Sequence, residues 1–245
     1  MPSVSTMRIA PAGAVETAAE RDIYESKLPL DGARILELGC GRAEQTRKIA
    51  GSGRGREILA LEVDEIQHAR NLAITDLPNV TFALGGAQAI PAPDASVDIV
   101  LMFKSLHHVP VELMAASLGE IARVLRPGGH AYLSEPIFAG RYNDVLRLFH
   151  DERRVRAAAF EAVRAAVAAG VLELEAQIFF NAPVFFPDFA AFERLVIDVT
   201  HTRHRLAPAL RAAVEAEFNR SLTPEGARFE APMRVDLLRK PCTPG

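Results

Sequence analysis

The chain has 245 residues, of which 49% are hydrophobic, and its formal net charge at pH 7 is -3. A chain of this length can bury one large core, and its slight acidity supplies no general basic field, so we expect no nucleic acid partner. Two cysteines cannot form a disulfide framework and there is no apolar run of 18 residues, so we expect a cytoplasmic protein without a membrane segment, either monomer or homodimer.

The first 136 residues alternate between helical and strand-like patterns. Helical patterns cover about 15–27, 42–50, 64–75 and 111–125, and apolar strand-like runs cover 35–38, 58–63, 80–84, 97–103 and 130–133. This alternation is typical of a parallel sheet with helices on both faces. The sequence therefore predicts an α/β fold of the doubly wound class.

The pattern changes after Pro136. An Ala/Arg-rich stretch at about 141–170 predicts one long helix, longer than an ordinary crossover, which we expect to cap the carboxyl edge of the sheet. A plain structural brace is the alternative. The remaining patterns predict a strand at about 175–185, helices at about 187–198 and 205–220, and a last strand at about 233–238.

The run Ile35–Leu38 ends in two closely spaced glycines, Gly39 and Gly41. Such glycines let the backbone turn tightly and approach a ligand, and a following helix directs its first amides toward that ligand. A nucleotide-like ligand also needs an acidic residue at the end of the next strand for its ribose hydroxyls, and Glu62 stands there. Asp64 is the alternative, but Asp64–Gln67 has the pattern of a helix N-cap, which already gives that carboxylate a structural role.

Five further motifs follow the glycine loop in order, and the whole pattern resembles the class I S-adenosylmethionine-dependent methyltransferases of the small-molecule type. The resemblance covers about residues 33–136. Its motifs are Leu36–Gly41, Glu62, 86–88 with 90–94, 97–100, 106–109 and 120–129.

The resemblance implies a Rossmann-like, doubly wound, mostly parallel seven-stranded sheet with helices on both faces and a helical cap. We expect a single methyltransferase domain over 1–245, with an N-terminal helical segment (1–32), a cofactor-binding core (33–136), a helical substrate cap (137–176) and C-terminal elements that complete the sheet (177–245). It also implies methyl transfer from S-adenosyl-L-methionine, with S-adenosyl-L-homocysteine as product, to an oxygen, nitrogen or carbon atom of a small molecule.

Site residues follow from the positions that match the family. Glu37, Gly39 and Gly41 are expected at the methionine portion of the cofactor, Glu62 at the ribose, and Ala87 and Gln88 at the adenine. Phe103 is expected to wall the methyl-transfer site. The same resemblance adds Cys40 and Val63 to the cofactor-binding set, with simple packing as the alternative for Cys40.

Three positions depart from the family pattern. Ala43 stands where a third loop glycine is usual, and Gly86 where an aspartate usually bonds the adenine amino group. Gln88 can both donate and accept, so it is the expected substitute. Lys104 follows Phe103, either as a surface residue or as an anchor for an anionic group of the substrate.

A base is needed if the acceptor must lose a proton, and His107 and Glu135 are the candidate catalytic residues, with a purely structural role as the alternative. Lys104, His107, Tyr142 and His150 are expected to line the substrate pocket. We expect no metal, because the pair His107–His108 and the pair His201 and His204 have no accompanying ligands in the sequence.

Two other functions remain open. One is a non-catalytic module that binds S-adenosylmethionine or S-adenosylhomocysteine. The other is a nicotinamide-dependent oxidoreductase, although Glu44 stands where the third glycine of that motif belongs.

Overall fold

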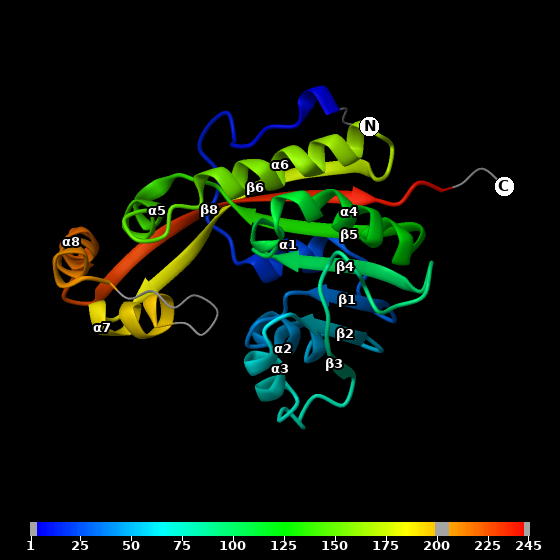
Figure 1. The fold of residues 1–245 in the computed structure, drawn as a ribbon, viewed down its shortest axis with the longest axis horizontal. Helices are drawn as coiled ribbons and strands as arrows, with labels where there is room; N and C mark the ends of the chain where they lie inside the picture. Colours follow the sequence, from blue (N-terminus) through cyan, green and yellow to red (C-terminus); the bar gives the residue numbers. More distant parts are fainter. Residues whose placement is uncertain (1–3, 199–205, 243–245) are drawn as a thin grey trace.

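The protein is described by a computed structural model that covers residues 4–198 and 206–242. It has a central β-sheet with helices on both faces (Figure 1). The strands are β1 (Arg34–Leu38), β2 (Glu57–Glu62), β3 (Val80–Leu84), β4 (Val97–Phe103), β5 (Leu125–Pro136), β6 (Glu173–Phe186), β7 (Leu222–Thr223) and β8 (Gly226–Arg239).

The strands pair in the order β3-β2-β1-β4-β5-β8-β6, and the two-residue β7 adds to β8. Strands β1 to β5 are parallel, whereas β8 is antiparallel to both β5 and β6. The prediction of a mostly parallel, Rossmann-like sheet is confirmed. The order reverses between β1 and β4, and ligands of such sheets bind at the carboxyl ends of strands beside that reversal.

The α-helices are α1 (Glu20–Lys27), α2 (Glu44–Ala50), α3 (Glu65–Asn71), α4 (Met114–Val124), α5 (Gly140–Leu146), α6 (Arg153–Ala168), α7 (Phe189–Phe192) and α8 (Pro208–Asn219). Within the described ranges, the other helical elements are three short 3₁₀ turns, η1 (Val4–Thr6), η2 (Leu106–His108) and η3 (Val111–Leu113), and one π turn, η4 (Glu193–Ile197).

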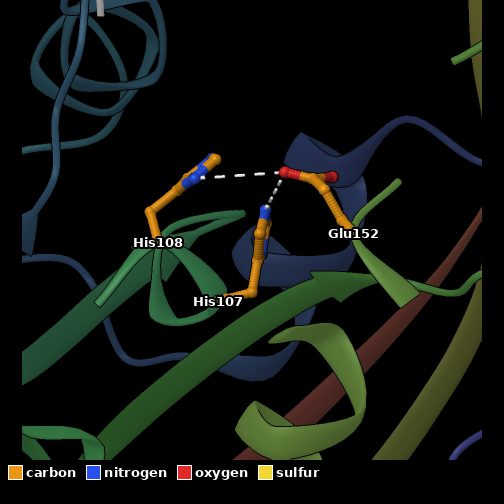
Figure 2. A group of neighbouring side chains, drawn as sticks. All are labelled: His107, His108 and Glu152. Atoms are coloured by element: carbon orange, nitrogen blue, oxygen red, sulfur yellow. Dashed lines mark ion pairs between the residues drawn. The ribbon is translucent and has the colours of Figure 1, made fainter. Parts of the chain in front are cut away.

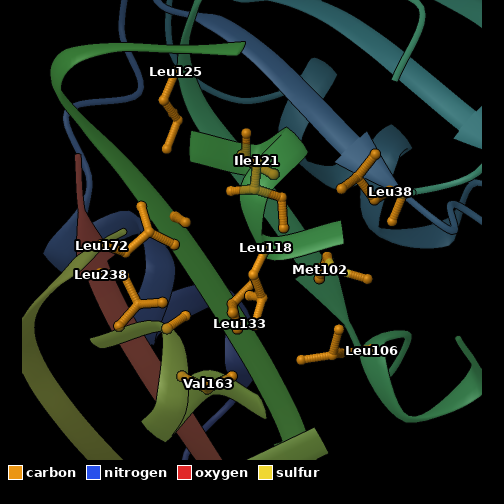
Figure 3. Close-up of a cluster of buried hydrophobic side chains, with 14 of the residues drawn as sticks. Leu38, Met102, Leu106, Leu118, Ile121, Leu125, Leu133, Val163, Leu172 and Leu238 are labelled. Atoms are coloured by element: carbon orange, nitrogen blue, oxygen red, sulfur yellow. The ribbon is translucent and has the colours of Figure 1, made fainter. Parts of the chain in front are cut away.

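Alternate residues of the central strands enter two separate cores, one on each face of the sheet. Leu101 of β4 packs on the face covered by α1 and α2, whereas its neighbour Met102 packs on the face covered by α4 and α6. Figure 3 shows the second core, in which Leu118 and Ile121 of α4 approach the strands. Burial on both faces explains why these strands appear in the sequence as continuous apolar runs.

The prediction of one long cap helix at 141–170 was wrong. The chain forms α5 and α6, separated by residues 147–152, and Asp151 Oδ1 accepts a hydrogen bond from the amide of Arg153 where α6 begins. Helix α6 is a crossover helix on the sheet, because Phe160 and Val163 are buried in the same core as α4 (Figure 3). Alanine-rich composition predicts helix but does not show which surface the helix covers.

A separate cluster of aromatic side chains joins α5, α7 and α8 to the far ends of β6 and β8. Its buried members include Val145, Phe186, Phe192, Phe218 and Phe229. We call these three helices and two strand ends the accessory lobe; it lies beyond the carboxyl ends of β4 and β5 (Figure 1). Across the described ranges, no helix is both long and apolar enough to span a membrane.

Candidate active site

The loop between β1 and α2 has three residues in the left-handed region, with φ of 74° at Gly39, 51° at Gly41 and 59° at Ala43. A Cβ on Gly39 would lie 2.7 Å from Ser105 Oγ, so glycine is required there for close packing. A Cβ on Gly41 would meet nothing within 4 Å. The backbone at Gly41 therefore has open space on the side where a Cβ would lie, and a ligand can approach it there.

The carboxylate of Glu62 holds this loop against the end of β2. It accepts hydrogen bonds from the amides of Gly41 (2.7 Å), Val63 (2.8 Å) and Asp64 (3.0 Å). The carboxylate of Asp64 instead accepts from the amides of Ile66 and Gln67, at 2.9 and 3.3 Å, so its predicted role as the N-cap of α3 is confirmed. Of the two carboxylates, Glu62 is the one in contact with the glycine loop.

Glu37 is buried behind the same loop, with 2% of the residue exposed. Thr46 Oγ1 donates a hydrogen bond of 2.6 Å to its Oε2. Burial raises the pKa of the Glu37 carboxyl to about 7, because the charged form loses its hydration, and the nearby charge of Glu62 adds to this effect. A cation bound beside it would favour ionisation of this carboxyl.

Gly86 and Gln88 lie after β3, where the adenine contact was predicted. A Cβ on Gly86 would lie 2.4 Å from Gln88 Oε1 and 2.7 Å from Gln88 Nε2. The Gln88 amide therefore occupies the space that a side chain at position 86 would use. That Gln88 substitutes for the missing aspartate stays a prediction, and Ala87 between the two residues is buried.

Phe103, at the end of β4, packs in a triangle of aromatic rings. Its ring centroid lies 5.7 Å from those of both Tyr24 and Tyr132, which are themselves 6.4 Å apart. The hydroxyls of both tyrosines and Glu20 Oε1 are buried without a hydrogen-bond partner among the described residues. Such atoms need water or a ligand to offset their lost hydration. No local pattern in the sequence indicated this polar group, because its members come from α1 and β5.

His107 is held between two carboxylates, those of Glu135 and Glu152, and Figure 2 shows the one of Glu152. Its Nδ1 bonds Glu135 Oε2, and its Nε2 lies 3.4 Å from Glu152 Oε1. Burial alone would lower the pKa of His107, but the two carboxylates outweigh it and raise the pKa to about 9. The imidazole is therefore protonated at neutral pH, with both nitrogens engaged.

Glu152, the residue immediately before α6, contacts nitrogen atoms of several side chains. Arg156 donates to its Oε2 from Nε (3.1 Å) and Nη2 (2.5 Å), and His150 Nε2 lies 2.8 Å from its Oε1. Burial opposes the charged form, yet His107 and Arg156 together hold the pKa of this carboxyl well below its usual range. The structure thus brings together His107, Glu135 and His150 from the predicted set, and adds Glu152 and Arg156, which sequence reasoning missed.

The other predicted pocket residues pack elsewhere, although the charges of Arg156 and Glu152 act on Tyr142. Lys104 is exposed and takes a left-handed conformation, with φ of 55°. Tyr142 packs in the accessory lobe against Phe186 and Phe229, with ring centroids 6.1 and 5.6 Å away. Cys40 is buried and near Asn71 Nδ2 (3.4 Å), whereas the Val63 side chain is exposed. His201 and His204 lie outside the described residues.

Residues 35–129 match the family model described as "Methyltransferase domain". Three curated bacterial relatives match over similar lengths. An uncharacterised methyltransferase of Mycobacterium tuberculosis is 38% identical over 102 residues, which are 42% of this chain and 39% of the relative. The 27-O-demethylrifamycin SV methyltransferase of Amycolatopsis mediterranei is 34% identical over 46% of this chain and 43% of its own.

The fatty-acid O-methyltransferase of Mycolicibacterium smegmatis is also 34% identical, over 46% of this chain and 38% of its own length. The chain therefore matches less than half of each of these relatives. Among solved structures, the YcgJ protein of Bacillus subtilis has a TM-score of 0.61 with 18% identity, over 90% of this chain and 97% of that one. At this identity the likeness shows the fold alone.

The matched segment contains the glycine loop, Glu62, Gln88 and Phe103, and it ends before the accessory lobe. The buried carboxyl of Glu37, the carboxylate of Glu62 and the open backbone at Gly41 suit a ligand that has cationic and hydroxyl groups. Residues 35–129 are thus a class I S-adenosylmethionine-dependent methyltransferase domain.

Proposed function

We propose that this protein transfers a methyl group from S-adenosylmethionine to an oxygen, nitrogen or carbon atom of a small-molecule acceptor. The observation that carries this proposal is the hydrogen bond between the Gly41 amide and Glu62, 2.7 Å long. It ties the left-handed glycine loop to the acidic end of β2 and leaves Gly41 open to a ligand.

Three of the predicted cofactor residues have surroundings that support the roles proposed for them. We propose that Glu37 acts at the methionine portion, where a positively charged group of the cofactor would favour ionisation of its carboxyl. We propose that Glu62 acts at the ribose. Gln88 would meet the adenine with an amide that both donates and accepts. When bound, S-adenosylmethionine supplies a methyl group already activated on a sulfonium, so the chain mainly has to align the acceptor and exclude water.

We propose that the acceptor lies between the carboxyl end of β4 and the accessory lobe. The two relatives with named substrates act, by their names, on a rifamycin precursor and on a fatty acid, both of them small molecules. The match to the family model ends at residue 129, before the accessory lobe begins. The match to the family model therefore concerns the residues proposed to bind the cofactor and not those proposed to bind the acceptor. The proposal therefore specifies the acceptor only as a small molecule.

His107 and Glu135 are proposed as positioning residues. A base must offer an unprotonated nitrogen, and the pKa of His107, raised to about 9 by its two carboxylates, keeps the ring protonated at pH 7. Glu135 also accepts the amide of Leu106 at 2.9 Å, so it fixes both the ring and the turn that carries it. The pair therefore fastens η2 to the end of β5 beside the proposed acceptor region.

We also propose a cytoplasmic location, because Cys40 and Cys242 are both free, as is usual in a reducing compartment.

Calorimetric titration with S-adenosylmethionine, S-adenosylhomocysteine and NAD tests the proposal. We expect binding of both sulfur compounds and none of NAD, followed by methyl transfer to at least one member of a broad panel of hydroxylated, amino and carboxylic acceptors. Failure of both sulfur compounds to bind would overturn the cofactor assignment.

The second candidate is a module that binds these compounds without catalysis, favoured by the absence of a carboxylate at Gly86. Tight binding without transfer to any acceptor of the panel would support that candidate in place of the enzyme.

A further inference from the structure

We propose that His107, His108 and Glu152 form a binding site for a divalent transition metal of the zinc class. The inference rests on the arrangement of these side chains and is independent of the proposed methyl transfer. His107 and His108 come from η2, and Glu152 comes from the residue immediately before α6 (Figure 2).

The three ligand atoms converge on one point. One ligand atom from each residue, a ring nitrogen of either histidine or a carboxylate oxygen of Glu152, lies within 4.8 Å of the other two. His107 Nε2 and His108 Nδ1 lie 3.4 and 4.0 Å from the same atom, Glu152 Oε1. Ligands bound to zinc at about 2.0–2.2 Å in a tetrahedron stand about 3.4 Å apart. The first pair already has this separation, and the second pair, which involves the half-exposed His108 side chain, is 0.6 Å longer (4.0 against 3.4 Å).

Outer hydrogen bonds hold two of these ligands in the required orientation. Glu135 bonds His107 at Nδ1, which directs Nε2 toward the cluster, where a bound metal would replace the proton that Nε2 carries in the metal-free protein. Arg156 bonds Glu152 at Oε2, which directs Oε1 toward the cluster. Metal-binding histidines commonly have their second ring nitrogen held by a carboxylate in this way. A cation at Oε1 also leaves the Arg156 bonds in place, because those bonds use the other oxygen.

The donor set indicates the metal. Two imidazoles and one carboxylate suit zinc and similar divalent ions better than magnesium or calcium, which prefer oxygen ligands. Three protein ligands leave at least one coordination position for water or for an oxygen of a bound molecule. His150 Nε2, 2.8 Å from Glu152 Oε1, stands beside the same position.

This proposal departs from the expectation of no metal. The pair His107–His108 has no accompanying ligand nearby in the sequence, because Glu152 follows it only after β5 and α5. The fold supplies that ligand by packing the start of α6 against η2.

Zinc titration of the full chain, stripped beforehand with a chelator, tests the proposal. We expect one equivalent of Zn²⁺ to bind in competition with a chromophoric chelator, and Co²⁺ to give ligand-field absorption without a thiolate charge-transfer band. His108→Ala should weaken Zn²⁺ binding by at least about tenfold. The His108 side chain is 49% exposed, so this variant should fold, and Glu152→Gln should weaken binding as well.

His130→Ala is the matched control. His130 Nε2 also pairs with a carboxylate, Glu175 Oε2 at 3.2 Å, but no second histidine joins that pair among the candidate metal-binding groups of the described residues. Zinc affinity should be unchanged in this variant. The proposal is overturned if the wild type binds no stoichiometric Zn²⁺, if His108→Ala binds as tightly as the wild type, or if the Co²⁺ spectrum shows thiolate ligation by Cys40 or Cys242.

Discussion

Replacing Glu37 by glutamine should change the pH dependence of stability. Glu37 is fully enclosed behind the glycine loop, and its only hydrogen bond among the described residues comes from Thr46. Burial raises the pKa of its carboxyl from 4.5 to about 7 in the folded protein. Glutamine has nearly the same shape, can accept the Thr46 hydrogen bond and never ionises.

The sign follows from the two pKa values. Below pH 4.5 the carboxyl is protonated in both the folded and unfolded chains, so ionisation contributes nothing to stability. Between pH 4.5 and 7 the unfolded chain loses this proton while the folded chain keeps it, so stability falls as pH rises. Above pH 7 the folded chain has lost the proton as well, so this contribution to stability falls no further. A shift of about 2.5 units corresponds to about 3 kcal/mol, as an order of magnitude.

Urea unfolding of the wild type and Glu37→Gln at pH 5, 6, 7 and 8 measures this effect. The variant should gain stability relative to the wild type as pH rises, by about 2.5 kcal/mol between pH 5 and pH 8. Glu44→Gln, at an exposed position on α2, is the control and should show no such trend. A difference between Glu37→Gln and wild type that does not vary with pH would refute the argument.

Three further experiments probe the loop and its surroundings. Glu62→Ala should weaken S-adenosylmethionine binding much more than Asp64→Ala, which should mainly cost about 1 kcal/mol of stability through the lost N-cap; equal losses of affinity in calorimetry would contradict the ribose assignment. Gly39→Ala should lower the thermal midpoint more than Gly41→Ala, because only the first new Cβ meets another side chain, whereas Gly41→Ala should reduce cofactor affinity; the reverse ranking of midpoints would count against the loop geometry. Lys104→Gly should raise the free energy of unfolding in urea by about 1 kcal/mol, since φ is 55° at this position, whereas Lys104→Ala keeps the backbone strain and should not. Equal stability of the two variants would contradict this explanation.

Much of the sheet could be predicted from the sequence, because both faces of its central strands are buried. The bounds predicted for Val80–Leu84 and Val97–Phe103 match β3 and β4. The N-cap at Asp64 was predicted as well, since a cap depends on residues within a few positions along the chain. The order of motifs around the glycine loop was sufficient to indicate the methyltransferase domain.

The site beyond the loop depended on contacts between distant parts of the chain. Tyr24 and Tyr132 meet at Phe103 only because α1 lies across β4 and β5. Glu152 reaches His107 only because α6 packs on the sheet instead of capping it. Local sequence thus determined the strands, the glycine loop and the helix N-cap at Asp64, since these depend on residues that are neighbours along the chain. Tertiary structure alone decided which charged side chains, such as His107 and Glu152, are buried together at the edge of the sheet. The reason is that burial and charge pairing depend on where the helices pack.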